Sequence, residues 1–242
     1  MGDDKRTYLG QHFLIDFNAI TKIVESCNVG KKDVVLEFGT GYGYLTKKIA
    51  ELAGRVYTYE IDKELYCKAK SYLVNNSNVM IFNQDFFEAD QFEFDYFVSN
   101  IPYGRSKEIM KWLSLHEFGE AVIMVQKEFF EKLTASPGNA DYSVVSVFSQ
   151  YCFDIDPLFD VDKNSFLPPP KIESKVIRLK RRRNKMNKEI IAGLEFLFSY
   201  RNKNAASLLN TKLYQNKKID QLNVETLVKI CNELIESKQF RK

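Results

Sequence analysis

Short apolar runs alternate with helical patterns along the first part of the chain. Each run is rich in valine, isoleucine and aromatic residues, which predicts a buried strand, and the apolar spacings of three and four between the runs predict helices. The expected strands are residues 34–38, 55–60, 79–82, 94–99 and 121–125, and the expected helices are 44–53, 63–72, 106–115 and 127–133. This alternation predicts an α/β fold with a doubly wound, mostly parallel sheet.

The pattern changes after residue 138. Residues 151–159 and 175–179 predict two strands joined by a proline-rich loop, and we expect them to form an antiparallel edge of the sheet. The basic stretch 180–188 is then expected to be a linker.

A second helical pattern occupies the end of the chain. Apolar residues recur at helical spacing over 190–198, and again after Asn223, which is a suitable N-cap. We therefore expect two domains, an α/β domain over residues 1–184 and a small helical module over residues 185–242.

Composition describes an ordinary globular protein with a local excess of positive charge. The 242 residues are 45% hydrophobic and 14% aromatic, and 35 Lys and Arg against 32 Asp and Glu leave a net charge of +3. Between Lys171 and Lys188, however, there are nine basic residues and one acid. Such a cluster can bind phosphates or can simply be a solvated linker, and charge alone leaves both interpretations open.

Cysteine and histidine usage excludes several classes of site. The four cysteines are far apart and only two histidines are present, so we expect neither a disulfide framework nor a metal site, and a reducing cytoplasm suits the chain. No apolar run reaches the length of a membrane span, so we expect no membrane partner. We also expect a monomer.

Polar groups follow three consecutive expected strands. After the first strand, residues 37–43 form a glycine-rich turn in which Gly39 and Gly41 let a ligand approach bare backbone. Glu60, at the end of the second strand, can accept both ribose hydroxyls of a nucleoside, and Asp85, after the third, can accept an adenine amino group. Each feature also has an ordinary alternative. The glycine turn could serve packing alone, Glu60 could be a surface acid, and Asp85 could cap a helix. The three strand ends together favour a nucleoside-type cofactor.

The fourth expected strand ends in Asn100-Ile101-Pro102-Tyr103. This tetrapeptide suits methyl transfer to the exocyclic N6 of adenine, whose lone pair is delocalised into the ring. The side-chain carbonyl of Asn100 and the backbone carbonyl of Ile101, held extended before Pro102, can accept the two N6 protons. Tyr103 offers a ring on which an extruded base can stack. A strand-ending turn is the alternative, and the cofactor residues upstream favour the chemistry.

Together these motifs resemble the small-subunit ribosomal RNA adenine dimethyltransferases over nearly the whole chain. The matching segments are Gly10–Leu14, Glu37–Thr46, Glu60–Asp62, Asp85, Asn100–Tyr103, Gln126–Glu128, Ser136–Gly138 and Phe166–Lys171. After the tetrapeptide, the family usually has an apolar residue and then small hydroxyl residues, whereas this chain has Gly104-Arg105-Ser106-Lys107.

The resemblance implies a Rossmann-like class I methyltransferase that uses S-adenosyl-L-methionine. Its cofactor contacts fall on His12, Leu14, Gly39, Glu60, Asp85 and Asn100. The implied reaction is transfer of two methyl groups to each of two adjacent adenosines in the 3′-terminal hairpin of small-subunit rRNA, during maturation of the immature small ribosomal subunit. We expect RNA contacts at Lys180, Arg181, Arg182, Arg183, Arg201 and Lys203.

Three alternatives stay open. A methylase of the same architecture could act on large-subunit rRNA, as in macrolide resistance, but Leu197–Lys203 resembles a segment of the small-subunit branch. A largely non-catalytic assembly or transcription factor could keep the fold, but the intact Asn100–Tyr103 and Glu60 argue against loss of chemistry. A DNA adenine methylase is the third, and nothing in the sequence resembles a DNA-recognition domain.

Overall fold

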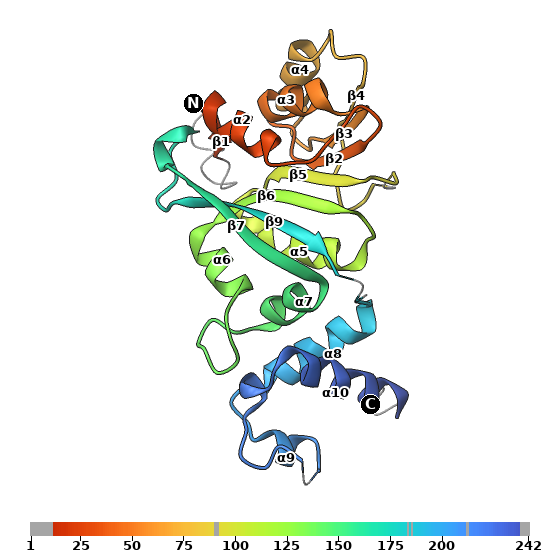
Figure 1. Ribbon diagram of the computed structural model, residues 1–242, viewed down its shortest axis with the longest axis vertical. Coiled ribbons are helices and arrows are strands. Elements are labelled where there is room, and N and C mark those ends of the chain that lie inside the picture. Colours follow the sequence, from red (N-terminus) through yellow and green to blue (C-terminus); the bar gives the residue numbers. More distant parts are fainter. Residues whose placement is uncertain (1–11, 90–91, 183, 185, 212, 238–242) are drawn as a thin grey trace. The chain divides into compact units, whose positions relative to one another are not determined.

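The computed structural model describes residues 12–89, 92–182, 184, 186–211 and 213–237 (Figure 1). Contacts divide the chain into two compact units that interleave along the sequence. We call them the α/β unit (Met1–Ser106, Phe118–Lys127 and Ile155–Arg181) and the helical unit (Lys107–Glu117, Glu128–Asp154 and Arg182–Lys242). The domain division at residue 184 stays a prediction about which parts fold independently.

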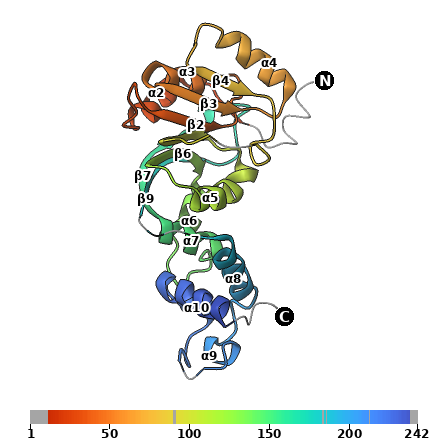
Figure 2. The ribbon, with the colours of Figure 1, turned by 90° about the vertical axis from the view of Figure 1, so that its right-hand side faces the viewer.

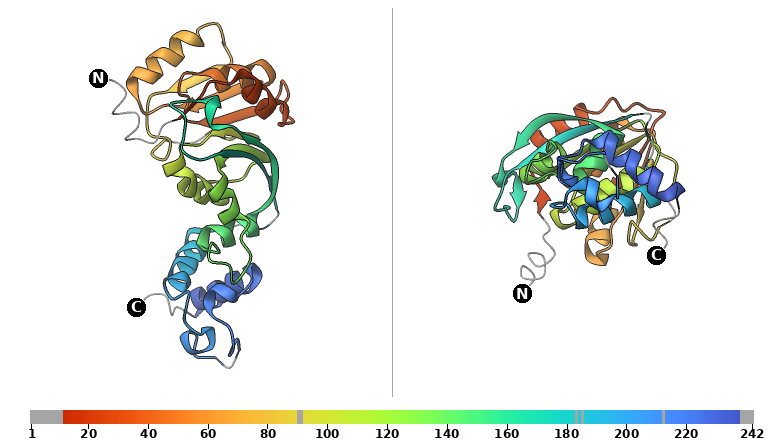
Figure 3. Two further views of the ribbon diagram at one scale, coloured as in Figure 1. Left: turned by 90° about the vertical axis from the view of Figure 1, so that its left-hand side faces the viewer. Right: turned by 90° about the horizontal axis from the view of Figure 1, so that it is seen from below.

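A seven-stranded sheet organises the α/β unit, with strand order β4-β3-β2-β5-β6-β9-β7. Its strands are β2 (Val34–Phe38), β3 (Arg55–Tyr59), β4 (Val79–Phe82), β5 (Tyr96–Asn100), β6 (Glu120–Gln126), β7 (Phe153–Val161) and β9 (Ser174–Arg181). The first five are parallel, and β9 pairs antiparallel with β6. Figure 3 shows β9 beside β7 at this end of the sheet. The predicted mostly parallel sheet with an antiparallel edge is confirmed.

The strand order reverses between β2 and β5, because the chain builds β3 and β4 on one side of β2 and then returns to add β5 and β6 on the other. In an open parallel sheet, such a reversal leaves a crevice at the carboxyl ends of the two central strands. The expected glycine turn follows β2 and the expected tetrapeptide begins at the end of β5. The topology therefore brings these two motifs to one edge.

Three helices belong to the α/β unit: α2 (Phe17–Glu25), α3 (Tyr44–Leu52) and α4 (Lys63–Tyr72). Asp16 caps α2 and Asp62 caps α4, each by accepting backbone N–H groups of the first turn. Apolar faces of α2 and α3 pack into the core, where Ile20, Ile23 and Ile49 are each 1% exposed. A short strand β1 (Phe13–Leu14) pairs antiparallel with β8 (Phe166–Leu167), so the start of the described chain is tied to the proline-rich loop.

The helical unit contains most of α5 (Ser106–Leu115) and of α6 (Lys127–Leu133), with α7 (Val144–Cys152), α8 (Lys188–Ser199), α9 (Ala205–Leu208) and α10 (Val224–Glu236). Helices α7, α8 and α10 contact one another (Figure 2). Among the described residues, 3₁₀ turns occur at η1 (Tyr103–Arg105) and η2 (Lys163–Ser165) in the α/β unit and at η3 (Ile219–Gln221) in the helical unit. The side chain of Asn223 accepts from Thr226 N at 2.9 Å, which confirms the predicted cap of α10.

Several sequence-based boundaries are wrong. The expected strand 94–99 starts too early, because β5 begins at Tyr96. Residues 151–152, predicted to begin a strand, end α7, a helix whose residues 144–149 are all buried. A helix buried on every side lacks the one-sided apolar pattern, so its period is hidden. The predicted linker 180–188 is shorter, because residues 180–181 continue β9 and α8 begins at Lys188.

The described residues were compared with the requirements of a membrane span and of a metal site. None of their helices has the length and hydropathy of a bilayer span. No three of their His, Cys, Asp or Glu side chains cluster as metal ligands would.

Candidate active site

A pocket lies at the carboxyl ends of β2, β3 and β5, within the α/β unit. Its wall combines the turn after β2, the ends of β3 and β5, and the β1 segment. The structure brings every predicted cofactor residue to this wall: His12, Leu14, Gly39, Gly41, Glu60, Asp85 and Asn100. The pocket also contains residues to which the sequence analysis assigned no cofactor contact, among them Glu37, Tyr42, Ile61 and Arg105.

The turn after β2 depends on glycine. Gly39, Gly41 and Gly43 have φ values of 82°, 55° and 85°, a left-handed region that disfavours side chains. A Cβ built on Gly39 would meet no atom within 4 Å, so the space beside the loop is open. The backbone N–H groups of Gly39 and Thr40 donate to the Tyr59 carbonyl at 3.1 Å, which ties the loop to the end of β3. A fixed loop with open space beside it fits an approaching ligand.

Glu60 is a buried acid, 5% exposed, and not a surface carboxylate. Its Oε2 accepts the Gly41 N–H at 2.8 Å and its Oε1 accepts the Asp62 N–H at 3.0 Å. Burial raises the pKa of Glu60, and the two N–H donors oppose this shift. The carboxylate therefore lies directly against the glycine loop.

Sequence reasoning assigned no separate role to Glu37, which lies in β2 just before the same loop and lines the pocket. It is 1% exposed, and its Oε2 accepts from Thr46 Oγ1 at 2.6 Å and Thr58 Oγ1 at 2.7 Å. Burial raises its pKa to about 8, so the acid is mostly protonated at neutral pH. An acid inside an otherwise apolar strand was the available signal. The hydroxyl network joins β2, β3 and α3 under the pocket.

Asp85 carries a second interaction that the sequence did not predict. Its Oδ1 accepts the Phe87 N–H at 2.9 Å, which forms a local turn. The same oxygen lies 3.9 Å from Arg105 Nη2. The Arg105 guanidinium also lies 4.7 Å from the centre of the Phe87 ring. The departure from the family at Arg105 therefore places a cation in the pocket wall, beside the acid proposed to contact adenine.

The orientation of the Asn100 side chain follows from one contact. Its Nδ2 donates to the His12 carbonyl at 3.2 Å. Because a carbonyl only accepts, the amide nitrogen must face His12, and the amide oxygen is left for another donor. Pro102 itself has φ −54° and ψ 129°. The strand end thus presents a fixed acceptor at the pocket wall.

Tyr103 and Ile101 lie beside the pocket and not among its lining residues. The Tyr103 hydroxyl shares a hydrogen bond with Ser174 Oγ at 2.7 Å, and its ring centre lies 5.3 Å from that of His12. Burial raises the pKa of Tyr103, and the bond to Ser174 opposes this shift. The His12 ring in turn bonds the Pro168 carbonyl at 2.8 Å. The tyrosine ring is therefore held in one place from both ends.

Two of the predicted RNA-binding positions lie close to acids of their own unit. Lys180 lies 4.0 Å from Asp156, and Arg182 forms an ion pair with Asp154 at 2.7 Å. Arg183 lies outside the described residues. Two acids of β7 therefore face the basic run that was expected to meet phosphate.

The remaining predicted cations have local contacts as well. The Arg181 guanidinium lies 5.9 Å from the Phe118 ring centre. Arg201 and Lys203 come just after the end of α8, and Arg201 Nε lies 3.3 Å from Asp220 Oδ2. Lys203 is exposed.

Comparison with known protein families shows which family the chain belongs to. The model of a family described as ribosomal RNA adenine dimethylase matches residues 2–237. The chain belongs to this family. It is therefore an rRNA adenine dimethyltransferase, an enzyme that takes its methyl groups from S-adenosylmethionine.

Relatives with one shared name are similar to this chain over most of its length. The chain is 39% identical over 181 residues to the ribosomal RNA small subunit methyltransferase A of Caldanaerobacter subterraneus subsp. tengcongensis, covering 71% of this chain and 68% of that one. It is 37% identical to the protein of that name from Mycoplasmopsis pulmonis, over 85% and 82% of the two chains. It is 32% identical to that from Thermotoga neapolitana, over 94% and 90%.

Solved structures support the same fold. A dimethyladenosine transferase from Plasmodium falciparum superposes with a TM-score of 0.78 at 25% identity, over 93% of this chain and 98% of that one. The 23S rRNA methyltransferase ErmE superposes with a TM-score of 0.69 at 26% identity, over 92% and 99%. Because the second protein is named for large-subunit rRNA, the fold alone does not decide the RNA target.

Proposed function

We propose that this enzyme dimethylates N6 of two adjacent adenosines in the 3′-terminal hairpin of small-subunit rRNA, while the subunit is still immature. The observation that carries this target is the agreement of the relatives named small subunit methyltransferase A, which extends over as much as 94% of the chain. The proposal includes a cytoplasmic monomer that acts without a metal or a membrane partner.

The pocket residues have distinct roles in binding the methyl donor. S-adenosylmethionine supplies an electrophilic methyl group on its sulfonium. Glu60 accepts ribose hydroxyls, Asp85 accepts the adenine amino group, and the bare backbone at Gly39 and Gly41 allows close approach. His12 and Leu14 also line the pocket. The support for these roles is the common position of the residues at one pocket.

The turn after β5 prepares the nucleophile. Asn100 Oδ1 and the Ile101 carbonyl accept the two N6 protons, which draws the nitrogen out of conjugation with the ring and frees its lone pair. Tyr103 stacks on the extruded base. No strong general base is needed, because the N–C bond would form as the methyl–sulfur bond breaks, leaving a positive charge on N6 that makes its proton acidic enough to pass to water. Positioning of the two reactants supplies most of the rate.

The competing target is large-subunit rRNA, because the chain also shares its fold with ErmE. Incubation of the enzyme with methyl-labelled S-adenosylmethionine and undermethylated small or large subunits separates the two. We expect label on two adjacent adenosines near the 3′ end of small-subunit rRNA, mapped by nuclease digestion and mass spectrometry. Label in large-subunit rRNA alone would overturn the proposed target.

The RNA interface proposed from sequence comprises Lys180, Arg181, Arg182, Arg183, Arg201 and Lys203. The support for it is the charge of the basic run and the RNA substrate of the family. Phosphate contacts of this kind supply affinity and carry no base information.

A further inference from the structure

Two segments of the helical unit, residues 201–205 and 217–220, run antiparallel and bond through their backbones. We call them the basic ribbon. Asn204 and Lys218 form an antiparallel bridge. The other backbone bonds are Asp220 N to Arg201 O (3.2 Å), Ile219 N to Lys203 O (3.2 Å) and Ala205 N to Lys217 O (2.8 Å).

The ribbon gathers positive charge that is dispersed in the sequence. Residues 200–219 include five Lys or Arg and no acid. Lys203, Lys217 and Lys218 are exposed. Because Asn204 lies opposite Lys218, Lys203 and Lys217 are diagonal neighbours on one face of the ribbon, and Lys218 lies on the other face. No ion pair within the described part of the chain involves these three lysines. The lysine charge is thus not neutralised by a neighbouring acid.

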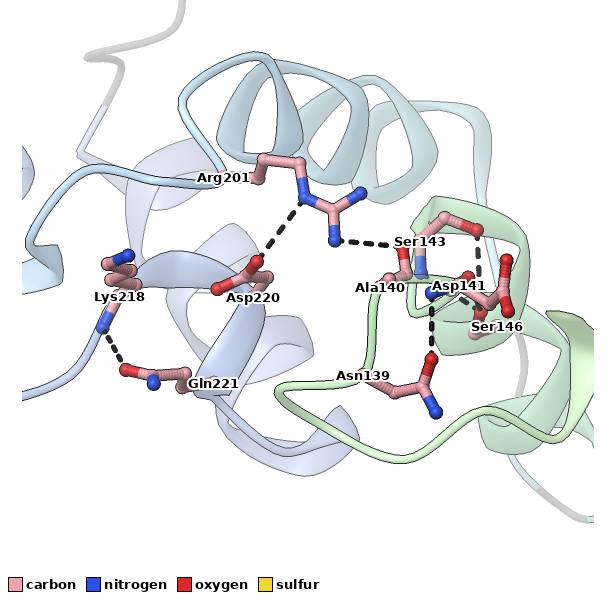
Figure 4. Close-up of polar contacts among 9 residues, drawn as sticks. All are labelled: Asn139, Ala140, Asp141, Ser143, Ser146, Arg201, Lys218, Asp220 and Gln221. Carbon is pink, nitrogen blue, oxygen red and sulfur yellow. Dashed lines mark hydrogen bonds and ion pairs between the residues drawn. The ribbon is translucent and has the colours of Figure 1, made fainter.

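Arg201 has a different arrangement, which Figure 4 shows. Its Nε lies 3.3 Å from Asp220 Oδ2, and its Nη2 donates to the Ala140 carbonyl at 3.1 Å. The Gly138 N–H donates to the Asp220 carbonyl at 2.7 Å. The arginine and Asp220 therefore join the ribbon to loop 136–141, whose residues are all exposed.

The second attachment of this loop is buried. Tyr142, 0% exposed, donates its hydroxyl to the Leu222 carbonyl at 3.1 Å. An exposed loop and a two-stranded ribbon have little core of their own, so such attachments keep them in one conformation. A fixed array of lysines loses less conformational entropy on binding a polyanion than the same lysines on a mobile loop.

We propose that Lys203, Lys217 and Lys218 bind the phosphate backbone of the rRNA substrate, and that Arg201 is the clamp that holds the ribbon to loop 136–141. This inference rests on the rRNA substrate of the proposed function. It adds two lysines that sequence reasoning did not select, and it moves Arg201 from the RNA interface to a positioning role. The lysine ammonium is a point charge suited to phosphate, and phosphate binding releases counterions, so affinity must fall with salt.

The test compares two variants of equal net charge. One neutralises the ribbon: Lys203→Gln, Lys217→Gln and Lys218→Gln. The control neutralises three exposed lysines elsewhere in the helical unit: Lys132→Gln, Lys188→Gln and Lys229→Gln. Affinity for immature small subunits is measured over a series of salt concentrations, and thermal unfolding confirms that both variants fold.

We expect the ribbon variant to lower the slope of log affinity against log salt by about 2 to 3, since each phosphate contact contributes roughly 0.7 to 0.9. The control should keep the wild-type slope. Equal losses in both variants would show a general effect of charge, and an unchanged slope in the ribbon variant would show that the ribbon does not meet phosphate. Either result overturns the proposal.

Arg201→Gln tests the clamp. A clamp predicts a lower unfolding temperature, a similar loss in Asp220→Asn, and a wild-type salt slope for the folded protein. A salt slope lowered by about one with unchanged unfolding would instead make Arg201 a phosphate ligand and overturn its positioning role. Mapping the methylated nucleotide with wild-type enzyme tests the proposed rRNA target separately. A wrong target and a ribbon that does not bind phosphate would therefore give different results.

Discussion

Replacement of Glu37 by glutamine tests whether the acid under the glycine loop is neutral. Glu37 is 1% exposed, and its pKa is raised from 4.5 to about 8 by burial. A folded pKa above the unfolded value means that the native state binds the proton more tightly. The resulting stability is fully present below about pH 4.5 and is lost as pH rises towards 8.

The magnitude follows from these two pKa values. Linkage gives about 1.36 kcal/mol per pH unit where the unfolded acid is ionised and the folded acid is not. Between pH 5.5 and pH 7.5, the contribution of Glu37 to the free energy of unfolding should fall by roughly 2.5 kcal/mol. Glutamine does not titrate, and its amide oxygen can still accept the hydroxyls of Thr46 and Thr58. Wild type should therefore lose this amount relative to Glu37→Gln.

Urea unfolding followed by circular dichroism at pH 5.5, 6.5 and 7.5 measures the difference between the two proteins, in which other titrating groups cancel. The exposed Glu51→Gln variant in the same unit controls for the substitution itself. Parallel pH dependence of wild type and Glu37→Gln would refute the reasoning, because it would mean that Glu37 is ionised in the folded protein.

Three further predictions concern the pocket and the turn. Glu60→Ala should weaken S-adenosylmethionine binding by about 1–3 kcal/mol, as for a lost hydrogen bond to a charged group, and unchanged affinity by calorimetry would remove Glu60 from the site. Asn100→Ala should keep cofactor affinity within roughly tenfold but lower turnover by about 10² or more; a change in affinity alone would contradict this role. Tyr103→Phe should retain much of the activity, while Tyr103→Ala should lose it, since stacking needs only the ring. Phe should also lower the unfolding free energy by about 1–2 kcal/mol, because Ser174 loses its partner, and equal inactivity of both variants would refute stacking.

The sequence alone determined the helices, strands and turns that depend only on neighbouring residues. The bounds of α4, α5 and α6 agree with the apolar spacing, and the Asn223 cap occurs where it was expected. The bounds of strands β2 and β4 likewise agree, because each is a short and nearly continuous apolar run. The glycine turn and the tetrapeptide were visible for the same reason, since backbone conformation and turn chemistry depend on neighbouring residues. The family resemblance, carried by these motifs, predicted the reaction.

Only the tertiary structure decided which distant residues meet. Glu37 and Thr58 are 21 residues apart, and their bond depends on the parallel register of β2 and β3. Lys203 and Lys217 lie close together because the chain turns back between them. The Arg201 guanidinium donates a hydrogen bond to the Ala140 carbonyl, 61 residues away in the sequence. A sequence pattern reports the spacing of residues along one element and carries no information on the partner across space. The buried helix α7 was hidden for a related reason, because a helix surrounded by protein on all sides has no polar face to reveal its period.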